Sequence, residues 1–203
     1  AIDAGGLSRV QSFTLIVGNV NEQPDLITID SLNVAENADG AIVGRLATSD
    51  PDVGDTHTYT VDDNRFEVNG DGDLKLKTGQ TLDHETEGTV DVVVTATDAG
   101  GLSRVQSFTL TVGNVNEQPD LITIDSLNIA ENADGAIVGR LATSDPDVGD
   151  THTYTVDDNR FEVNGDGDLK LKTGQTLDHE AEGTVDVIAV SYTHLTLPTM
   201  ELV

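Results

Sequence analysis

The sequence predicts an all-β protein built from tandem seven-stranded antiparallel β-sandwiches with Greek-key connections. Apolar and polar side chains alternate at a period of two, which is the pattern of a half-buried strand. Turn-forming residues separate the alternating segments about every 8–12 residues, as in sandwich folds. The segment NVNEQPDLITIDSL begins at Asn19 and again at Asn114, so the sequence repeats with a period of 95 residues. That length suits a small domain and is too long for a solenoid repeat.

Seven segments of the complete repeat carry the strand pattern. In chain order they are Leu26–Val34, Ala41–Thr48, His57–Val61, Arg65–Val68, Leu74–Lys77, Thr89–Thr97 and Ser103–Val115. The third segment alternates Thr with Tyr and Val, which are favoured in strands. Asn69–Asp73 is rich in turn residues and predicts a hairpin connection between the fourth and fifth strands, with a minor calcium site as the alternative. No segment has the length, caps and spacing of an ordinary helix.

The repeat divides the chain into four parts. Residues 1–24 match the end of one repeat, 25–119 form a complete repeat, and 120–189 begin a further repeat that is truncated. Residues 1–92 and 96–187 differ at four positions: Ile2/Thr97, Ile16/Thr111, Val34/Ile129 and Thr86/Ala181. Residues 8–20 therefore copy the predicted last strand, while the truncated repeat lacks that strand. A free strand and an open sheet edge in one chain predict strand exchange between copies.

The fourth part, residues 190–203, departs from the repeat. After Val187 the repeat would continue Val-Val-Thr-Ala-Thr-Asp, but the chain reads Ile-Ala-Val-Ser-Tyr-Thr. The stretch Val190–Thr199 (VSYTHLTLPT) resembles the translation of a transposase-type sequencing adapter. We therefore expect residues 190–203 to be a non-native tail, with a divergent terminal strand as the alternative.

The charge balance excludes several classes of function. The chain has 37 Asp and Glu against 10 Lys and Arg, a formal net charge of −27. Nucleic acids and anionic membrane surfaces repel such a polyanion. The absence of Cys excludes disulfides, thiolate metal sites and a cysteine nucleophile. Divalent cations would neutralise this charge in a folded protein, whereas a disordered acidic chain is the other interpretation.

The acidic residues of the repeat gather next to the predicted strand ends. Asp50 with Asp52, and Asp83 with Glu85, stand at alternate positions, where an extended backbone places side chains on one face. Paired carboxylates repel unless one is protonated or a cation lies between them. A hard cation that takes 6–8 oxygens, such as Ca²⁺, suits carboxylates mixed with Asn amides and backbone carbonyls.

Five motifs follow one another in this repeat: Glu36-Asn37, Asp50-x-Asp52, Leu82-Asp83-x-Glu85, Ala96-x-Asp98 and Asn114-Val115-Asn116-Glu117-x-Pro119. Their order resembles that of the cadherin repeat, and most of all the cadherin-like repeats of large bacterial secreted or surface adhesins, which often end in V-N-E-x-P. The resemblance spans residues 25–119 and the matching parts on either side. It implies an immunoglobulin-like, cadherin-like sandwich, an extracellular or cell-surface location, and a rod of repeats with Ca²⁺ at each junction.

The same resemblance implies the calcium ligands by position. For the full junction they are Glu36, Asp83, Glu85, the carbonyl of Val115, Asn116, Glu117, Asp145 and Asp147. An upstream half-junction would use Asn21, Glu22, Asp50, Asp52 and Asp98, and a downstream set would use Glu131, Asp178 and Glu180. The counterpart of Asp98 in the full junction is Thr193, and the linker has Glu117 and Gln118 where the family has Asp and Asn. These departures imply that calcium binding is retained with fewer ions or weaker affinity.

The function predicted from these features is a non-enzymatic, calcium-binding spacer or adhesion module. Its partners would be the neighbouring repeats of the same chain and other cell-surface proteins or glycans. The alternative is a calcium-dependent ligand- or carbohydrate-binding module attached to a secreted enzyme, although Tyr59 is the only Tyr or Trp of the complete repeat that could form a sugar platform. Acid–base catalysis by the paired carboxylates is a third interpretation, for which the repeat offers no pocket or polar cluster.

Overall fold

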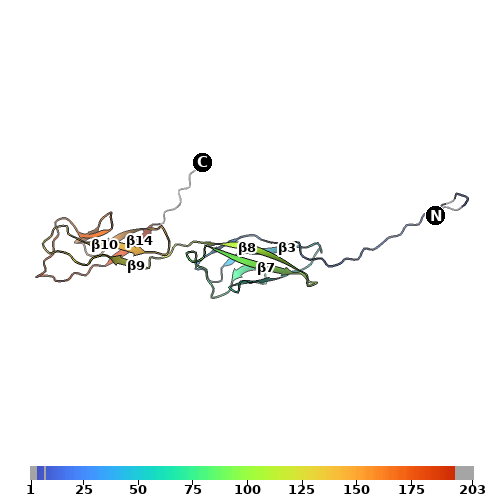
Figure 1. Cartoon of the computed structure of the whole chain (residues 1–203), viewed down its shortest axis with the longest axis horizontal. Coiled ribbons are helices and arrows are strands. Elements are labelled where there is room, and N and C mark those ends of the chain that lie inside the picture. The colour runs from blue at the N-terminus through green and yellow to red at the C-terminus, as the bar shows by residue number, and fades with distance from the viewer. Residues whose placement is uncertain (1–3, 7, 195–203) are drawn as a thin grey trace. The chain divides into compact units, whose positions relative to one another are not determined.

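The computed structural model describes residues 4–6 and 8–194 as two compact units (Figure 1). The first unit comprises Ala1–Leu82 and Thr89–Gly113, and the second comprises Asp83–Gly88 and Asn114–Val203. All regular elements among the described residues are strands, so the predicted all-β class is confirmed. This part of the chain contains no helix that is long and apolar enough to cross a membrane.

Two four-stranded sheets form the first unit. One sheet has the order β1-β3-β6-β5 and the other β2-β8-β7-β4. The strands are β1 (Leu26–Ile29), β2 (Asn33–Ala35), β3 (Ile42–Ser49), β4 (Thr58–Val61), β5 (Phe66–Val68), β6 (Asp73–Leu76), β7 (Thr89–Thr97) and β8 (Ser103–Gly113). All neighbouring strands are antiparallel except β2 and β8, which pair in parallel. The hairpin predicted at residues 69–73 is present, since β5 and β6 pair around it.

The first predicted strand, residues 26–34, is in fact two strands in different sheets. β1 pairs with β3 as far as Ile29, and then the Asp30 carboxylate accepts the backbone N–H of Arg45 at 2.7 Å. Gly44 permits this close approach, because a Cβ at Gly44 would lie 2.7 Å from both Asp30 Oδ1 and the carbonyl oxygen of Ser31. After this crossing the chain joins β8 in the opposite sheet as β2. The described residues of this unit therefore form eight strands rather than the seven predicted.

The core of the first unit lies between its sheets, as the alternation predicts. Along β7 the side chains of Val90, Val92, Val94 and Ala96 are buried and those between them are more exposed. β8 adds the fully buried Leu110 and Val112 from the neighbouring strand, and the opposite sheet adds the residues of β3, β5 and β6. The strand β8 thus contacts β7 on one side, β2 on the other, and the core beneath.

The second unit repeats part of this arrangement. Its sheets are β12-β13-β10-β9 and β11-β14. The strands are β9 (Leu121–Ile124), β10 (Ile137–Ser144), β11 (Thr151–Val156), β12 (Phe161–Val163), β13 (Asp168–Leu171) and β14 (Ala189–His194). Among the described residues, nothing corresponds to β8, and residues 128–130 and 184–188, the counterparts of β2 and of the first half of β7, form no strand.

The segment predicted to be a non-native tail lies partly in β14. Residues 190–194 pair with β11 in the register that β7 and β4 use in the first unit, since Tyr154 lies opposite Ser191 as Tyr59 lies opposite Ala96. The alternation of Val190, Ser191 and Tyr192 permits this pairing whatever the origin of the segment. Residues 195–203 lie outside the described residues, and the adapter origin of residues 190–203 stays a prediction.

Candidate metal centre

The loop after β3 brings together three carboxylates of the first unit. Oxygens of Asp50, Asp55 and Asp98 lie within 4.8 Å of one another, and Asp98 is buried. The backbone N–H of Asp55 donates to the carbonyl of Asp52 at 3.1 Å, and Gly54 has a φ of 90°. This tight turn carries Asp55 back toward Asp50. Sequence reasoning missed Asp55, although the Val53-Gly54 turn signal before it would have indicated the reversal.

Asp52 lies beside the preceding segment of chain rather than in that group. Its carboxylate accepts the side-chain amide of Asn19 at 2.5 Å and the backbone N–H of Glu22 at 2.7 Å. The hydrogen bond from Asn19, followed by the one from Glu22, lowers the pKa of Asp52. Asn21 donates its amide to Asp98 Oδ2 at 2.9 Å. Of the predicted upstream half-junction, Asp50 and Asp98 therefore share one cluster with Asp55, Asn21 contacts Asp98, and the backbone of Glu22 contacts Asp52.

Asp98 remains acidic despite its buried position. Burial acts to raise the pKa of Asp98, but the hydrogen bonds from the Asn21 amide and the backbone N–H of Leu102 outweigh burial and lower it. The Leu102 N–H lies 2.8 Å from Asp98 Oδ1. A carboxylate that stays ionised while buried is well suited to bind a cation.

The second unit contains the corresponding carboxylate cluster. Oxygens of Asp145, Asp147 and Asp150 lie within 4.8 Å of one another, and Asp147 is buried. The N–H of Glu117 donates to Asp147 Oδ2 at 2.7 Å, as that of Glu22 does to Asp52. Thr193, the counterpart of Asp98, lies in β14 and supplies no carboxylate. Asp147 takes the third place in this group.

Two oxygens of this cluster are buried without a hydrogen-bond partner. They are Asp145 Oδ2 and Asp150 Oδ2, and the side chain of Asp145 is only 4% exposed. His152 Nε2 lies 3.8 Å from Asp145 Oδ2, which is beyond hydrogen-bond distance. In the first unit the corresponding pair, His57 and Asp50, is 3.0 Å apart. Buried carboxylate oxygens with no donor fit a hard cation that binds through oxygen.

A third group forms around Glu36. Oxygens of Glu36, Asp83 and Glu85 lie within 4.8 Å of one another, and Glu36 is 2% exposed. The N–H of Thr86 donates to Asp83 at 2.9 Å and its hydroxyl donates at 3.0 Å, and these bonds lower the pKa of Asp83. The amide of Asn114 donates to Glu85 Oε1 at 3.1 Å. The predicted ligand set Glu36, Asp83 and Glu85 is therefore brought together.

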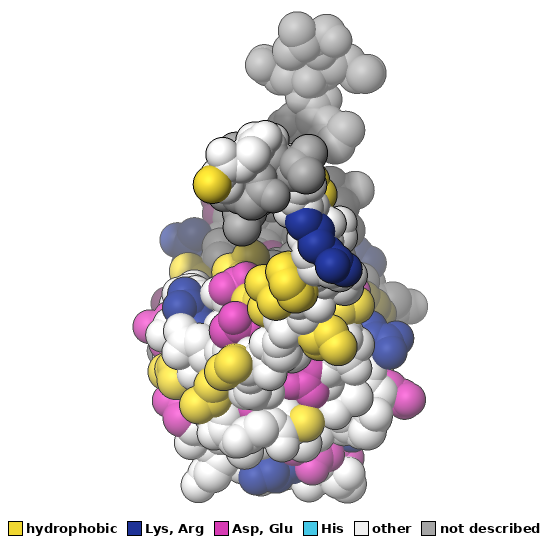
Figure 2. Space-filling model, turned by 90° about the vertical axis from the view of Figure 1, so that its right-hand side faces the viewer, with side chains coloured by type: hydrophobic (Ala, Val, Ile, Leu, Met, Phe, Trp, Pro, Cys, Tyr) yellow, Lys and Arg dark blue, Asp and Glu magenta, His cyan; other side chains and the backbone are white. Residues whose placement is uncertain are grey.

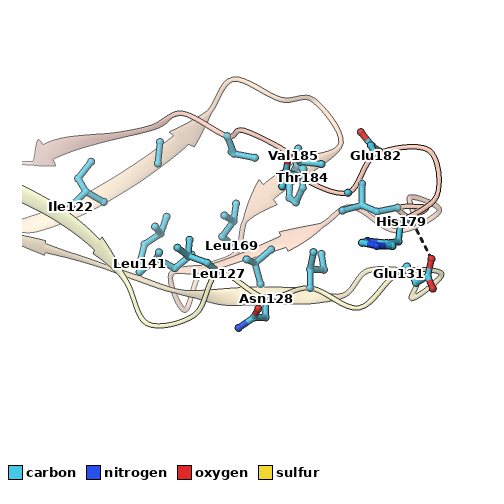
Figure 3. A pocket seen from close by; sticks show the side chains of 18 of the residues that line it. Ile122, Leu127, Asn128, Glu131, Leu141, Leu169, His179, Glu182, Thr184 and Val185 are labelled. Carbon is cyan, nitrogen blue, oxygen red and sulfur yellow. Dashed lines mark hydrogen bonds between the residues drawn. The ribbon is translucent and has the colours of Figure 1, made fainter.

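The remaining predicted residues are more exposed. Glu131, Asp178 and Glu180 also lie within 4.8 Å of one another, but all three are exposed. Glu131 accepts the backbone N–H of His179 at 3.0 Å (Figure 3). In the linker Val115 is 45% exposed, and Asn116 donates its amide to the carbonyl of Glu117 at 3.0 Å. Its counterpart Asn21 makes the same contact with the carbonyl of Glu22 at 3.4 Å, and Asn21 also donates to Asp98, where the second unit has Thr193 and no carboxylate.

Comparison with known proteins identifies the fold of these units. No protein-family model matches the chain. Protocadherin gamma-B6 of Homo sapiens is 31% identical over 162 residues, which cover 73% of this chain and 17% of that protein. Protocadherin gamma-C4 of Homo sapiens is 30% identical over 164 residues, covering 73% and 18%. The chain therefore spans less than a fifth of the length of these curated relatives.

Solved structures of cadherin repeats resemble the chain as well. Human protocadherin-24 EC1-2 matches with a TM-score of 0.63 at 17% identity, covering 86% of this chain and 97% of that one. Mouse cadherin-23 EC22-24 matches with a TM-score of 0.62 at 21% identity, covering 85% and 62%. The protocadherin gammaB7 EC3-6 cis-dimer matches with a TM-score of 0.54 at 23% identity, covering 85% and 47%. The units are cadherin-like domains, as the motif order indicated, and the named relatives are animal proteins.

Proposed function

We propose that this chain is a non-enzymatic, calcium-binding spacer or adhesion segment of a larger secreted or cell-surface protein, in which Ca²⁺ at the inter-repeat junctions stiffens the series of repeats. The observation that carries the proposal is the pair of buried oxygens on Asp145 and Asp150, beside Asp147, that accept no hydrogen bond. A buried carboxylate oxygen without a hydrogen-bond donor is costly, and a cation that takes it as a ligand removes that cost.

The full junction would draw its ligands from three stretches of chain. Glu36, Asp83 and Glu85 would supply the upstream carboxylates, Val115, Asn116 and Glu117 the linker oxygens, and Asp145, Asp147 and Asp150 the downstream carboxylates. Calcium would supply positive charge there. Without it, carboxylates about 4 Å apart repel by about 1 kcal/mol per pair even in water, and by more where they are buried. Extracellular calcium modules bind with a Kd of roughly 10⁻⁴–10⁻³ M.

The partners and the parent protein follow from the same reasoning. Protocadherins are the named relatives, and one similar structure is a cis-dimer of cadherin repeats, so we propose other cadherin-like repeats as partners. The V-N-E-x-P ending at residues 115–119 favours a bacterial adhesin as the parent protein. A cadherin-like fold with extracellular relatives supports a secreted or cell-surface location.

A carbohydrate-binding module attached to a secreted enzyme has less support. Tyr59 packs against the core of the first unit, and its hydroxyl lies 2.9 Å from Thr48 Oγ1. A sugar platform requires an exposed aromatic face, which Tyr59 does not offer in this arrangement. A glycan array probed in calcium and in chelator would detect such binding.

The proposal is tested by calcium titration followed by small-angle X-ray scattering. We expect calorimetry to show calcium binding, and we expect the maximum dimension to become more variable in chelator as the junction loosens. Sodium chloride at matched ionic strength is the control, since it screens charge without coordinating it. An absence of calcium binding would overturn the metal site. Binding with an unchanged maximum dimension would overturn the stiffening role alone.

A further inference from the structure

The second unit contains a cavity of about 680 Å³, lined by both apolar and polar side chains, where the first unit has a strand. Figure 3 shows Leu127 and Asn128 on one side of the cavity and Thr184 and Val185 on the other. These residues correspond to Leu32 and Asn33, next to and within β2, and to Thr89 and Val90 of β7. In the first unit β8 lies between those two segments and pairs with both. The cavity therefore occupies the place of β8.

The segments that line the cavity are less buried and less regular than their counterparts beside β8. Val90 and Val92 of β7 are 5% and 0% exposed under β8, whereas Val185 and Val187 are only partly buried. Residues 184–188 form no strand, although residues 184–187 have the same sequence as the paired residues 89–92. Identical sequences thus differ in structure because one pair of segments has a strand between them and the other, within the described residues, does not.

A strand that fits this cavity is present elsewhere in the same sequence. Residues 8–18 (SRVQSFTLIVG) are identical to β8 except for Ile16, where β8 has Thr111. The side chain of Thr111 is exposed, so the difference falls on the outward face. The described residues from 9 to 24 form no strand, and Phe13, Leu15 and Val17 are 81%, 86% and 93% exposed. Figure 2 shows exposed hydrophobic side chains gathered beside acidic ones on the face turned to the viewer.

We propose that, in the chain of 203 residues, residues 8–18 of one copy insert into this cavity of a second copy and complete its sandwich. In the register of β8, Phe13 would lie opposite Val187 and Leu15 opposite Val185, and Val17 would pair in parallel with Ile129. Those three side chains correspond to Phe108, Leu110 and Val112, which pack into the core of the first unit. Adding a strand to an unpaired edge is an established mode of recognition between chains.

A second copy is the expected donor because of where the segment is held. Asn21 is bonded to Asp98, next to the end of β8 at Ser103, whereas the chain leaves the first unit at Gly113, the other end of β8. Each copy then gives one strand and receives one. Such a heterologous contact produces oligomers that grow with concentration rather than a closed pair of identical faces.

Two adjacent substitutions test the proposal without disturbing either folded unit. Leu15→Asn changes an inward position of the inserted strand, and Ile16→Asn changes the neighbouring outward position. Both side chains are almost fully exposed before insertion. We expect the mean mass of the unsubstituted chain and of the Ile16→Asn variant to rise with concentration in sedimentation velocity. The Leu15→Asn variant should need an at least tenfold higher concentration to reach the same mean mass.

A synthetic peptide of residues 8–18 provides the second arm of the test. We expect it to bind the Leu15→Asn chain with one peptide per chain and to slow amide exchange in residues 181–188, whereas the same peptide with Leu15→Asn should do neither. An unsubstituted chain that is monomeric at every concentration would overturn the proposal. So would equal association by the two variants, or a peptide that leaves residues 181–188 unprotected. None of these readouts depends on calcium, so they are independent of the proposed function.

Discussion

At the scale of single residues, the arrangement depends on carboxylates that remain ionised close together. Asp98 is buried yet has a lowered pKa because amide and backbone N–H groups donate to it. Asp145 and Asp150 each have a buried oxygen that no donor reaches. Protein N–H groups therefore satisfy the carboxylate of Asp98, whereas the buried oxygens of Asp145 and Asp150 need a cation.

Asp150 is the residue whose removal tests this distinction most directly. The Asp150→Asn substitution removes one negative oxygen from the cluster, so we expect calcium affinity measured by calorimetry to fall about tenfold or more. Asp166→Asn is the matched control, because Asp166 lies in the exposed β12–β13 hairpin turn and outside every carboxylate cluster described above. Equal affinities for the two variants would show that Asp150 is not a ligand.

Asp63 allows the loss of folding stability at acid pH to be measured separately from calcium binding. The guanidinium of Arg65 donates to Asp63 at 2.8 Å, and this hydrogen bond is the main cause of the lowered pKa of Asp63. A carboxylate with a lowered pKa stabilises the fold above its unfolded value of about 3.9, and this stability is lost as the pH falls through the lower, folded value. We expect Asp63→Asn to weaken the pH dependence of urea stability below pH 4, measured in chelator. An unchanged pH dependence below pH 4 would contradict the stabilising role of the Asp63–Arg65 pair.

At the scale of elements, spacing predicts strands well and loop geometry poorly. The period-two pattern located the strands of the first unit to within a few residues, because burial on one face imposes it. It failed at residues 30–32, where the Asp30 carboxylate replaces a backbone acceptor and sends the chain to the other sheet. It also missed Asp55, because alternate positions share a face only in extended chain and the Gly54 turn ends the extension.

Identical sequences need not adopt the same structure. Residues 89–92 and 184–187 have one sequence, so the structural difference between them can be measured. Residues 89–92 pair with β8, whereas 184–187 pair with no strand of the described chain. We expect amide exchange at low protein concentration to be much slower in peptide 86–93 than in peptide 181–188. Mass spectrometry distinguishes the two peptides, since Thr86 is replaced by Ala181 and Val93 by Ile188. Equal exchange rates would contradict the difference in pairing.

At the scale of the whole molecule, charge and incomplete packing both oppose folding. With a net charge of −27 the acidic side chains repel one another. Among the described residues, the core of the second unit lacks the side chains that β8 provides in the first. The acid clusters concentrate much of that charge where a divalent cation can neutralise it. Calcium should therefore stabilise the molecule by more than the screening of its charge, and the two units should differ in stability.

Urea unfolding of the whole chain at low concentration tests both expectations. We expect two transitions, the lower from the second unit, because less apolar surface is buried there. Leu110→Ala empties a fully buried site in β8, so it should destabilise the first unit by about 2–5 kcal/mol and move the upper transition alone. Calcium should raise both midpoints further than sodium chloride of equal ionic strength, because coordination adds to screening. If the two salts act equally, or if Leu110→Ala moves the lower transition, the corresponding half of this account is wrong.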